Sequence, residues 1–440
     1  MDSLYTLFSQ ALQGYQPNKI VLAFSGGVDS RLLLALLSRY QQAHGIVCLA
    51  VHVHHGLSKN ADDWARQCQQ WCQHVEIECV IERVQLDLDG KSIEESAREA
   101  RYWALQRHVQ QGDILLTGQH SDDQLETFLL ALKRGSGPKG LSAMAQAMPW
   151  HQGTLIRPLL MASRDDIEHA AKTAQLDWVE DESNLDTRFD RNFIRHQVAP
   201  VLKQRWPHIH TSIQRSAELC AEQEAVLEEL LLARLQDLRA SDGSLSIDGM
   251  RQQSERVRMQ LLRMWLAEAA IRMPSRAHLT LIWQQVALAV RDANPILNLG
   301  QCEIRRFEQR LYHVVRQLEV TSWQSPLCAE QPLLLPDGLG QIRLTSDHCG
   351  DLAFTQAQLT QLQVIFNPEG LSAHPADRGH SRKLKKLFQE YGVPSWLRRR
   401  TPIVLCQGEV VAVMGVFVCK DFIGTGYKLD WQTKPHSVLG

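Results

Sequence analysis

The residues Ser25-Gly26-Gly27-Val28-Asp29-Ser30 stand between an apolar run, residues 20–24, and a stretch with helical periodicity, residues 31–40. An apolar strand followed by a glycine turn and a helix is typical of phosphate-binding units. The glycines let the backbone approach an anion, the serines add hydroxyl donors, and the helix adds free N–H groups and the positive end of its dipole. We therefore predict that residues 25–30, called the phosphate loop below, bind the phosphates of a nucleotide.

The phosphate loop follows neither of two common phosphate-binding patterns. It lacks the lysine of G-x-x-x-x-G-K-[ST], and no G-x-G-x-x-G occurs in this turn. Its form, S-G-G-x-D-S, resembles that of the PP-loop pyrophosphatases. The resemblance implies that ATP is cleaved between its α and β phosphates and that AMP is transferred to a substrate. An ordinary Gly-Gly turn is the alternative, and the coincidence of strand, loop, Asp29 and helix favours nucleotide binding.

Length and composition exclude several classes of protein. The chain has 440 residues, 44% of them hydrophobic, which is enough for two or three domains. No apolar run approaches the roughly 20 residues that span a bilayer, and the first residues do not resemble an export signal. We expect a soluble cytoplasmic protein with reduced cysteines and no membrane partner. Cys68 and Cys72 lie one helical turn apart, where packing is favoured over a metal pair.

Strand-like and helix-like segments alternate through the first half of the chain. The expected strands are residues 20–24, 46–53, 75–81 and 113–116. This alternation predicts an α/β fold with a doubly wound, mainly parallel sheet. In such sheets the ligand lies beyond the carboxyl ends of the strands. The phosphate loop and residues 52–57 and 118–123 would converge there.

Four segments are expected along the chain. Residues 1–212 form the ATP-binding catalytic domain. Helical stretches at 213–239, 255–271 and 278–290 predict a mainly helical domain over 213–320. A stretch rich in Pro, Gly and Gln predicts a linker at 321–345. Residues 346–440 form a small α+β domain with strands at 364–366, 403–406 and 410–418 and a helix at 383–389.

A second motif, Gly118-Gln-His-Ser-Asp-Asp-Gln-Leu-Glu-Thr127, leads from an expected strand into a helix. Asp122 or Asp123, together with Asp29, could hold Mg²⁺ against the phosphates, because this ion takes one or two carboxylates and completes its shell with phosphate oxygens and water. Helix capping alone is the alternative.

His52-Val-His-His55 ends a strand without a cysteine at zinc-site spacing. Contact with the base or ribose is favoured over metal binding.

The formal net charge of −2 argues against a protein that coats nucleic acid along its whole surface. Between Arg378 and Arg400, however, the sequence contains eight Lys or Arg residues and one acid, Glu390. This imbalance predicts phosphate contacts there.

The motifs, in this order, resemble the tRNA(Ile)-lysidine synthases over nearly the whole chain. The residues that carry the resemblance are the phosphate loop, His52-Val-His-His-Gly-Leu57, Ala97-Arg-Glu-Ala-Arg-Tyr102, the 118–127 motif, Arg134-Gly-Ser-Gly137, Arg157-Pro-Leu159, Asp181-Glu-Ser-Asn184, Arg191-Asn192, Arg195, Arg382-Lys-Leu-Lys-Lys-Leu-Phe388 and Val393-Pro-Ser-Trp-Leu-Arg398. Gln119 departs from the histidine that this family more often has.

The resemblance implies the reaction. An isoleucine tRNA with a CAU anticodon would have the O2 of its wobble cytosine adenylated by ATP, and free L-lysine would then attack C2 and displace AMP. The lysine amine has a pKa of about 10.4 and must lose a proton near neutral pH, to a site carboxylate or His120. The flipped cytosine must leave the stack of the anticodon loop.

The site residues expected on this basis fall into four groups. ATP would bind Ser25, Gly26, Gly27, Val28, Asp29, Ser30 and His52; Mg²⁺ would bind Asp29 and Asp123; catalysis would use Asp29, Asp122, Asp123, Arg98 and His120; tRNA would bind Arg101, Arg191, Arg195, Lys383, Lys386 and Arg398. A surface ion pair is the alternative for Arg98 and Arg101. The sequence leaves open whether the protein forms a homodimer.

Three rival functions are disfavoured. A tRNA thiolase generally needs catalytic cysteines or paired C-x-x-C motifs, and neither is evident. An amidotransferase would need a nucleophilic cysteine in a second catalytic domain. A non-catalytic RNA-binding protein is disfavoured by the intact Asp29, Asp122 and Asp123.

Overall fold

The computed structural model describes residues 1–86, 93–269, 271, 273–290, 293–300 and 302–433. The chain forms two compact units, Met1–Leu227 and Glu228–Gly440. Helix α10 (Ile209–Leu238) runs through the boundary between them, and the boundary expected at residue 212 falls inside this helix. In the part of the chain that is described, no helix is both long and apolar enough to cross a membrane.

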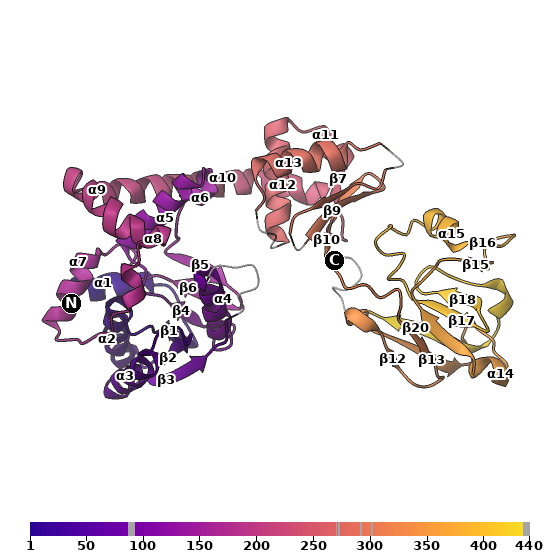
Figure 1. Cartoon of the computed structure of the whole chain (residues 1–440), viewed down its shortest axis with the longest axis horizontal. Helices are drawn as coiled ribbons and strands as arrows, with labels where there is room; N and C mark the ends of the chain where they lie inside the picture. Colours follow the sequence, from indigo (N-terminus) through magenta and orange to yellow (C-terminus); the bar gives the residue numbers. More distant parts are fainter. Residues whose placement is uncertain (87–92, 270, 272, 291–292, 301, 434–440) are drawn as a thin grey trace. The chain divides into compact units, whose positions relative to one another are not determined.

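The first unit is built on a six-stranded sheet of order β3-β2-β1-β4-β6-β5 (Figure 1). Its neighbouring pairs are parallel except β5 and β6, which form an antiparallel hairpin at one edge. The predicted doubly wound, mainly parallel sheet is therefore confirmed. The strands are β1 (Lys19–Ala23), β2 (Val47–His54), β3 (Glu78–Arg83), β4 (Ile114–Leu116), β5 (Ala147–Trp150) and β6 (Gly153–Ile156).

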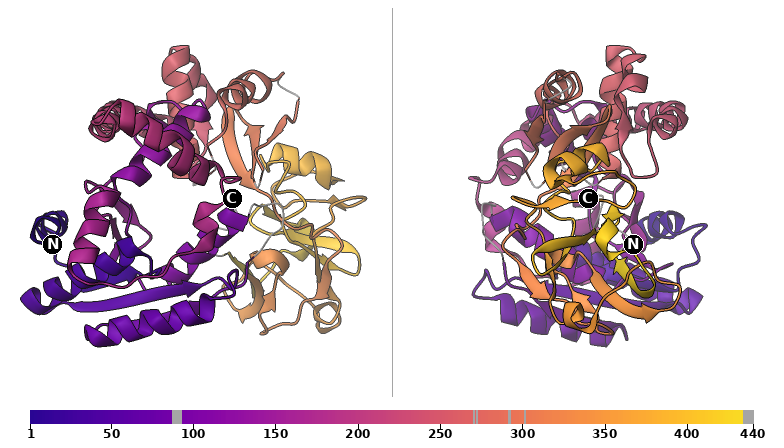
Figure 2. Two further views of the ribbon diagram at one scale, coloured as in Figure 1. Left: turned by 60° about the vertical axis from the view of Figure 1, so that its left-hand side comes forward. Right: turned by 90° about the vertical axis from the view of Figure 1, so that its right-hand side faces the viewer.

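Helices cover both faces of this sheet (Figure 2). One face shares a hydrophobic core with α1 (Asp2–Ala11), α2 (Val28–His44), α3 (Ala61–His74) and α7 (Arg164–Thr173), and the other packs against α4 (Ile93–Gln106). Because both faces of β1 are buried, this strand is apolar along most of its length. Ile20, Val21 and Leu22 are all 0% exposed.

The strand order reverses between β1 and β4, since the chain passes from β1 to β2 and β3 on one side and returns at β4 on the other. Ligands bind at such reversals, beyond the carboxyl ends of the strands. The phosphate loop leaves β1 at this edge, and residues 117–120 leave β4 to enter α5 (Ser121–Lys133).

A group of short helices follows α7 and packs against α5. Leu125 of α5, Ile194, Ala199 and Ile213 form a small core of their own. The elements between α7 and α10 are η1 (Glu182–Leu185), α8 (Asp190–Phe193), the π-helical turn η2 (Ile194–Val198) and α9 (Ala199–Arg205), while the short helix α6 (Pro138–Leu141) lies between α5 and β5.

The second unit contains two hydrophobic cores. The first core joins helices to a four-stranded antiparallel sheet of order β7-β10-β9-β8. The domain expected to be mainly helical thus also contains a sheet. Its elements after α10 are β7 (Leu245–Ser246), α11 (Ile247–Arg251), α12 (Glu255–Glu268), α13 (Arg276–Leu281), η3 (Ile282–Ala287), β8 (Ile296–Asn298), β9 (Cys302–Phe307) and β10 (Arg310–Val315).

The remaining residues form the small α+β arrangement that the sequence predicts. Its strands are β11 (Gln324–Pro326), β12 (Leu333–Leu334), β13 (Gln341–Asp347), β14 (Leu362–Ile365), β15 (Ser372–Ala373), β16 (Arg382–Lys383), β17 (Ile403–Cys406), β18 (Glu409–Val413), β19 (Phe417–Val418) and β20 (Gly426–Gln432). Its helices are η4 (Pro336–Gly338), α14 (Gln356–Leu359), α15 (Leu384–Glu390) and η5 (Lys420–Phe422).

The linker expected at residues 321–345 is wrong. Strands β11, β12 and the start of β13 lie in this stretch, and Leu327, Leu339, Ile342 and Leu344 are buried in the C-terminal core. The Pro and Gly residues there separate short strands that belong to the fold, so turn residues alone did not identify a connection between domains.

Candidate active site

The phosphate loop is held open by its own side chains. Gly26 has φ +86°, and its N–H donates to the Ser30 hydroxyl at 3.0 Å. That hydroxyl in turn donates to the Gly27 carbonyl at 3.0 Å. Gly27 is the N-cap of α2 and contributes no side-chain cap, so the first turn of this 17-residue helix presents backbone N–H groups and the positive end of its dipole. The arrangement suits an anion.

Glycine allows a close approach at the point where the two turns of this site meet. A Cβ atom at Gly118 would lie 3.2 Å from the Cβ of Asp29 and 3.4 Å from the backbone nitrogen of Ser30. The segment after β4 can therefore lie directly against the first turn of α2. This contact joins the phosphate loop to the 118–127 motif.

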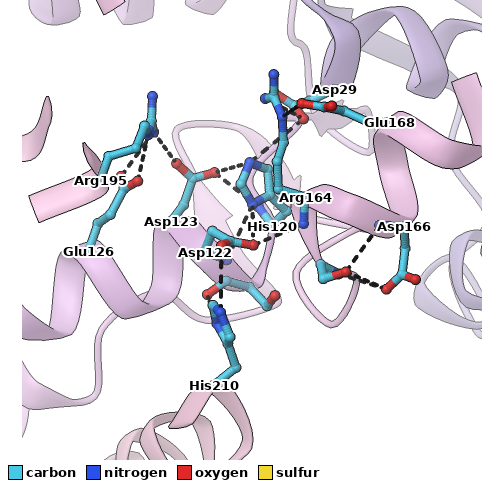
Figure 3. A network of polar contacts seen from close by, with 12 residues as sticks. Asp29, His120, Asp122, Asp123, Glu126, Arg164, Asp166, Glu168, Arg195 and His210 are labelled. Carbon is cyan, nitrogen blue, oxygen red and sulfur yellow. Dashed lines mark hydrogen bonds and ion pairs between the residues drawn. The ribbon is translucent and has the colours of Figure 1, made fainter. Parts of the chain in front are cut away.

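His120 lies at the centre of the resulting site (Figure 3). Its side chain is buried, and its Nε2 atom lies 3.6 Å from Oδ1 of Asp29 and 3.4 Å from Oδ2 of Asp123. Its Nδ1 accepts the backbone N–H of Asp122 at 3.3 Å as the cap of α5. With Nδ1 as an acceptor, the neutral ring carries its proton on Nε2 and points it toward the two carboxylates.

Asp29 is the carboxylate that the phosphate loop itself contributes. Burial raises its pKa above the ordinary value, and the positive charge of Arg164 opposes this rise, as protonation of His120 would. The Nη1 atom of Arg164 donates to both carboxylate oxygens, at 2.8 and 3.1 Å. A half-buried acid whose charge is only partly compensated favours the arrival of a further cation.

Asp122 faces a different group of partners. One of its oxygens forms an ion pair with Lys203 of α9, and the other accepts the backbone N–H of Arg164 at 2.9 Å. Nε2 of His210, at the start of α10, lies 3.5 Å away. Burial alone would raise the pKa of Asp122, but the hydrogen bonds from Lys203 and the Arg164 backbone outweigh burial and lower it. Asp122 thus connects α5 to α7, α9 and α10.

Glu126 is a member of the site that the sequence analysis quoted but did not assign. Its side chain is 1% exposed and is held by two arginines. Nε of Arg195 donates to Oε1 at 2.6 Å, and Nε of Arg191 donates to Oε2 at 3.0 Å. Arg195 also reaches Oδ1 of Asp123 at 3.3 Å. The sequence signal that could have found Glu126 was an acid one helical turn after Asp122 and Asp123, within a largely apolar helix.

The donor set of the site fits Mg²⁺. Asp29 and Asp123 both lie near Nε2 of His120 and offer carboxylate oxygens, the ligand type that this ion prefers. Among the described residues, no group of three or more His, Cys, Asp or Glu side chains could hold a metal ion by itself. Mg²⁺ usually takes one or two carboxylates and several phosphate or water oxygens, so the pair agrees with an ion that arrives with a nucleotide.

Three other expected site residues do not contact the acids of the 118–127 motif. His52 is buried, and its Nδ1 lies 2.9 Å from the carbonyl oxygen of Phe24, so its ring holds two strands together. Arg98 and Arg101 are exposed on α4, with Arg98 over the ring of Tyr102 at 5.3 Å. In the described part of the chain, neither arginine forms a hydrogen bond or ion pair with an acid of the 118–127 motif.

The basic run of the C-terminal domain divides into two kinds of residue. Lys383 and Lys386 are exposed at the start of α15. Arg398 instead donates from Nε to the Val393 carbonyl at 2.9 Å, and the buried Arg400 pairs with Asp337 at 2.7 Å. Part of the run therefore supports the fold, and the exposed lysines are open to a ligand.

The cysteines follow the packing interpretation. All ten are free thiols. Cys68 and Cys72 are both 0% exposed within the core beside Trp71.

Comparison with known proteins covers the same segments. A family model described as a PP-loop domain matches residues 2–202, one described as a TilS substrate binding domain matches residues 245–312, and one described as a TilS substrate C-terminal domain matches residues 362–432.

Full-length relatives agree with these models. The tRNA(Ile)-lysidine synthase of Vibrio vulnificus (strain CMCP6) is 59% identical over 98% of this chain and 100% of the relative. The enzyme of the same name from Vibrio cholerae O395 is 54% identical over 100% of both chains, and that of Photobacterium profundum is 49% identical over 97% of this chain and 99% of the relative. With this identity over essentially its whole length, a phosphate loop of PP-loop type and both substrate-binding domains, the chain belongs to the tRNA(Ile)-lysidine synthase family.

Proposed function

We propose that this enzyme ligates free L-lysine to C2 of the wobble cytidine of an isoleucine tRNA with a CAU anticodon, with ATP as the activating substrate and Mg²⁺ as its companion ion. Membership of the family supports this reaction over sulfur transfer, amide transfer and passive RNA binding. The observation that carries the site assignment is the contact of the phosphate loop with the segment that holds His120, Asp122 and Asp123.

The first step joins the cytosine to AMP. The O2 atom of cytosine attacks the α phosphorus of ATP, a P–O bond forms, and pyrophosphate leaves. The loop residues Ser25, Gly26, Gly27, Val28 and Ser30 would hold the departing pyrophosphate through backbone N–H groups and hydroxyls. Asp29 and Asp123 would hold Mg²⁺, which when bound offsets the negative charge of the phosphates.

The second step exchanges AMP for lysine. The lysine amine attacks C2, the C2–O2 bond breaks, and AMP leaves with that oxygen. The amine must give up a proton, and a site carboxylate is better placed than His120 to take it. Nδ1 of His120 already accepts a hydrogen bond, and its Nε2 faces Asp29 and Asp123 as a donor. We therefore assign His120 to holding the two carboxylates, and proton acceptance to a carboxylate of the site.

Asp122 is proposed as a positioning residue. Its carboxylate is fully engaged by Lys203, the backbone of Arg164 and His210, which lie on three other helices. It keeps α5 in register with those helices and leaves Asp123 to face the nucleotide.

Binding of tRNA is assigned to exposed cations. Lys383 and Lys386 offer phosphate contacts in the C-terminal domain, and Arg98 and Arg101 offer them on α4. Arg398 supports the C-terminal surface through its contact with the Val393 carbonyl. Arg191 and Arg195 lie at the acid network, and their exposed parts, 27% and 34% of the side chains, could reach the anticodon backbone beside the reacting base.

The reaction places the enzyme in the cytoplasm, where ATP, free lysine and tRNA meet. Whether two copies act together is a separate question, which sedimentation of the full chain answers directly.

The test is incorporation of labelled lysine into unfractionated bacterial tRNA with ATP and Mg²⁺, together with AMP release. We expect labelling confined to the isoleucine CAU species. Asp29→Ala should abolish AMP formation while tRNA binding persists, and Asp2→Ala, at an exposed acid paired with Arg39, serves as the control that keeps full activity. Retained AMP formation in Asp29→Ala would refute the site. Release of AMP by the wild type without lysine incorporation would refute the proposed nucleophile.

A further inference from the structure

Arg31 is a buried arginine that directly follows the phosphate loop in the sequence. It is 8% exposed, and its Nε and Nη1 atoms have no hydrogen-bond partner in the described part of the chain. Burial lowers the pKa of its guanidinium, and the carboxylate of Asp177 opposes this only in part. An arginine nevertheless stays charged in a protein. The first unit therefore holds a buried positive charge that its own acids compensate incompletely.

This charge belongs to the first turn of α2, at the end of the helix that the phosphate loop enters. The N–H of Arg31 donates to the Gly27 carbonyl at 2.9 Å and so makes the first hydrogen bond of the helix from its N-cap. Side chains of an α-helix lean toward its N-terminus. The side chain of Arg31 therefore leans toward the loop.

Trp71 of α3 connects the guanidinium to the loop. The Cζ atom of Arg31 lies over its ring, 5.1 Å from the centre. The same ring packs edge-on against Phe24, the residue before the loop, with 6.4 Å between the two centres. A Cβ atom at Gly26 would lie 3.7 Å from Cζ3 of Trp71. The indole thus packs beside the start of the loop and against Arg31.

A polyphosphate is the ligand that would compensate this charge. Phosphate loops of the form G-x-x-x-x-G-K-[ST] carry a lysine that reaches the phosphates. The loop of this chain has no lysine and contains an acid, Asp29. A positive charge in the protein interior is screened less by salt than one in solvent, so it attracts an anion over a longer distance. Arg31 is therefore suited to supply the cation that the loop lacks.

We propose that Arg31 is a positioning residue of the polyphosphate site, which favours binding through its charge and holds Trp71 against the loop without touching the ligand. This inference rests on the proposed function of the phosphate loop.

The experiment measures binding of inorganic tripolyphosphate, which probes the loop alone, by titration calorimetry of the full chain. Arg31→Met removes the charge but keeps a long side chain, and we expect its Kd to rise about tenfold. Arg31→Lys keeps the charge and should stay within about threefold of the wild type. Arg39→Met is the matched control. Arg39 lies on the same helix, over the ring of Tyr5 at 4.0 Å, and pairs with the exposed Asp2, so this variant should bind as the wild type.

Thermal melting without ligand separates this role from a purely structural one. Methionine removes a buried charge that lacks a full partner, so Arg31→Met should melt at or above the wild-type temperature while it binds tripolyphosphate more weakly. If Arg31 only supported the fold, weaker binding would accompany a lower melting temperature, and lysine would not restore binding.

Four outcomes would overturn the inference: unchanged binding by Arg31→Met, an equal loss in Arg31→Lys, an equal loss in Arg39→Met, or a loss in Arg31→Met that comes with a lower melting temperature. Failure of the loop assignment looks different. In that case Gly26→Ala would bind tripolyphosphate as the wild type does, whatever the Arg31 variants do.

Discussion

Replacement of Glu126 by Gln tests how the acid network is held. Breaking a buried ion pair by removing one partner generally costs about 3–5 kcal/mol. Glu126 is 1% exposed, but Arg191 and Arg195 are 27% and 34% exposed, so water screens part of the interaction. The glutamine oxygen can also still accept one hydrogen bond. We therefore expect the free energy of unfolding of the first unit to fall by about 2 kcal/mol, which corresponds to a melting temperature lower by roughly 4–8 °C in a unit of this size.

Calorimetric melting of the full chain measures this change. The control is Arg188→Ala, which removes an arginine–carboxylate pair from the same part of the chain. Arg188 is 87% exposed, and its pair with Asp186 should contribute less than about 1 kcal/mol. The reasoning fails if Glu126→Gln melts within about 1 °C of the wild type, or if Arg188→Ala destabilises the protein as much.

The same substitution has a functional consequence. Arg195 divides its hydrogen bonds between Glu126 and Asp123. When residue 126 is uncharged, the guanidinium should pair more strongly with Asp123, the acid assigned to Mg²⁺. We expect AMP formation by Glu126→Gln to require a higher Mg²⁺ concentration, while Arg188→Ala keeps the wild-type requirement. An unaltered requirement would limit Glu126 to a structural role.

Three further predictions concern single residues. Asp29→Asn should stabilise the ligand-free protein at pH 7. Burial raises the pKa of Asp29, so the ionised carboxylate destabilises the wild type above the folded pKa, and this cost disappears as the pH falls toward the unfolded value of 3.8. Urea unfolding should therefore show a difference between the two proteins at pH 7 and none at about pH 3.5. Asp122→Asn should have the opposite effect. The pKa of Asp122 is lowered, so the stability that it contributes through Lys203 is present above the unfolded value of 3.8 and is lost as the pH falls through the folded pKa. The variant should therefore be less stable than the wild type at pH 7 and equally stable in stronger acid. Gly26→Ala should lower the free energy of unfolding by roughly 1–3 kcal/mol, because the added Cβ would lie 2.8 Å from Sγ of Cys68 while φ stays at +86°. It should also abolish ATP binding measured by titration calorimetry of the full chain.

The sequence predicted the sheet well because its signals are local. Buried parallel strands read as continuous apolar runs, and the expected segments at 20–24, 46–53 and 113–116 agree with β1, β2 and β4 within one or two residues. The hairpin of β5 and β6 was missed, since Pro149 and the exposed Met148 interrupt the pattern at an edge strand. Apolar alternation could not reveal that the Pro- and Gly-rich stretch at 321–345 is part of a core.

For the side chains of the site, too, the sequence predicted the local features and missed the contacts between distant residues. Local motifs identified the phosphate loop, His120, Asp122 and Asp123. They did not identify Arg164 as a partner of Asp29, from which it is 135 residues away in the sequence. Nor did they identify Arg195 as a partner of Asp123, from which it is 72 residues away. Sequence spacing shows which residues share a helix face, but the partner on another helix is decided by packing.

The arginines of the site contact acids, in addition to the phosphate contact that remains a prediction for Arg191 and Arg195. Arg191 and Arg195 read as phosphate contacts in the sequence, yet both engage acids, and Arg164 does the same between Asp29 and Glu168. Carboxylates gathered beside a polyphosphate site repel one another and the nucleotide. Guanidinium groups behind them offset this charge and hold each acid in place, so that its free edge can meet a cation. Acids that must accept ATP therefore need positive charge beside them, and the places of the arginines follow from where the acids lie. This explains why the three arginines come from three different elements, α7, α8 and η2, and all contact acids beside the phosphate loop.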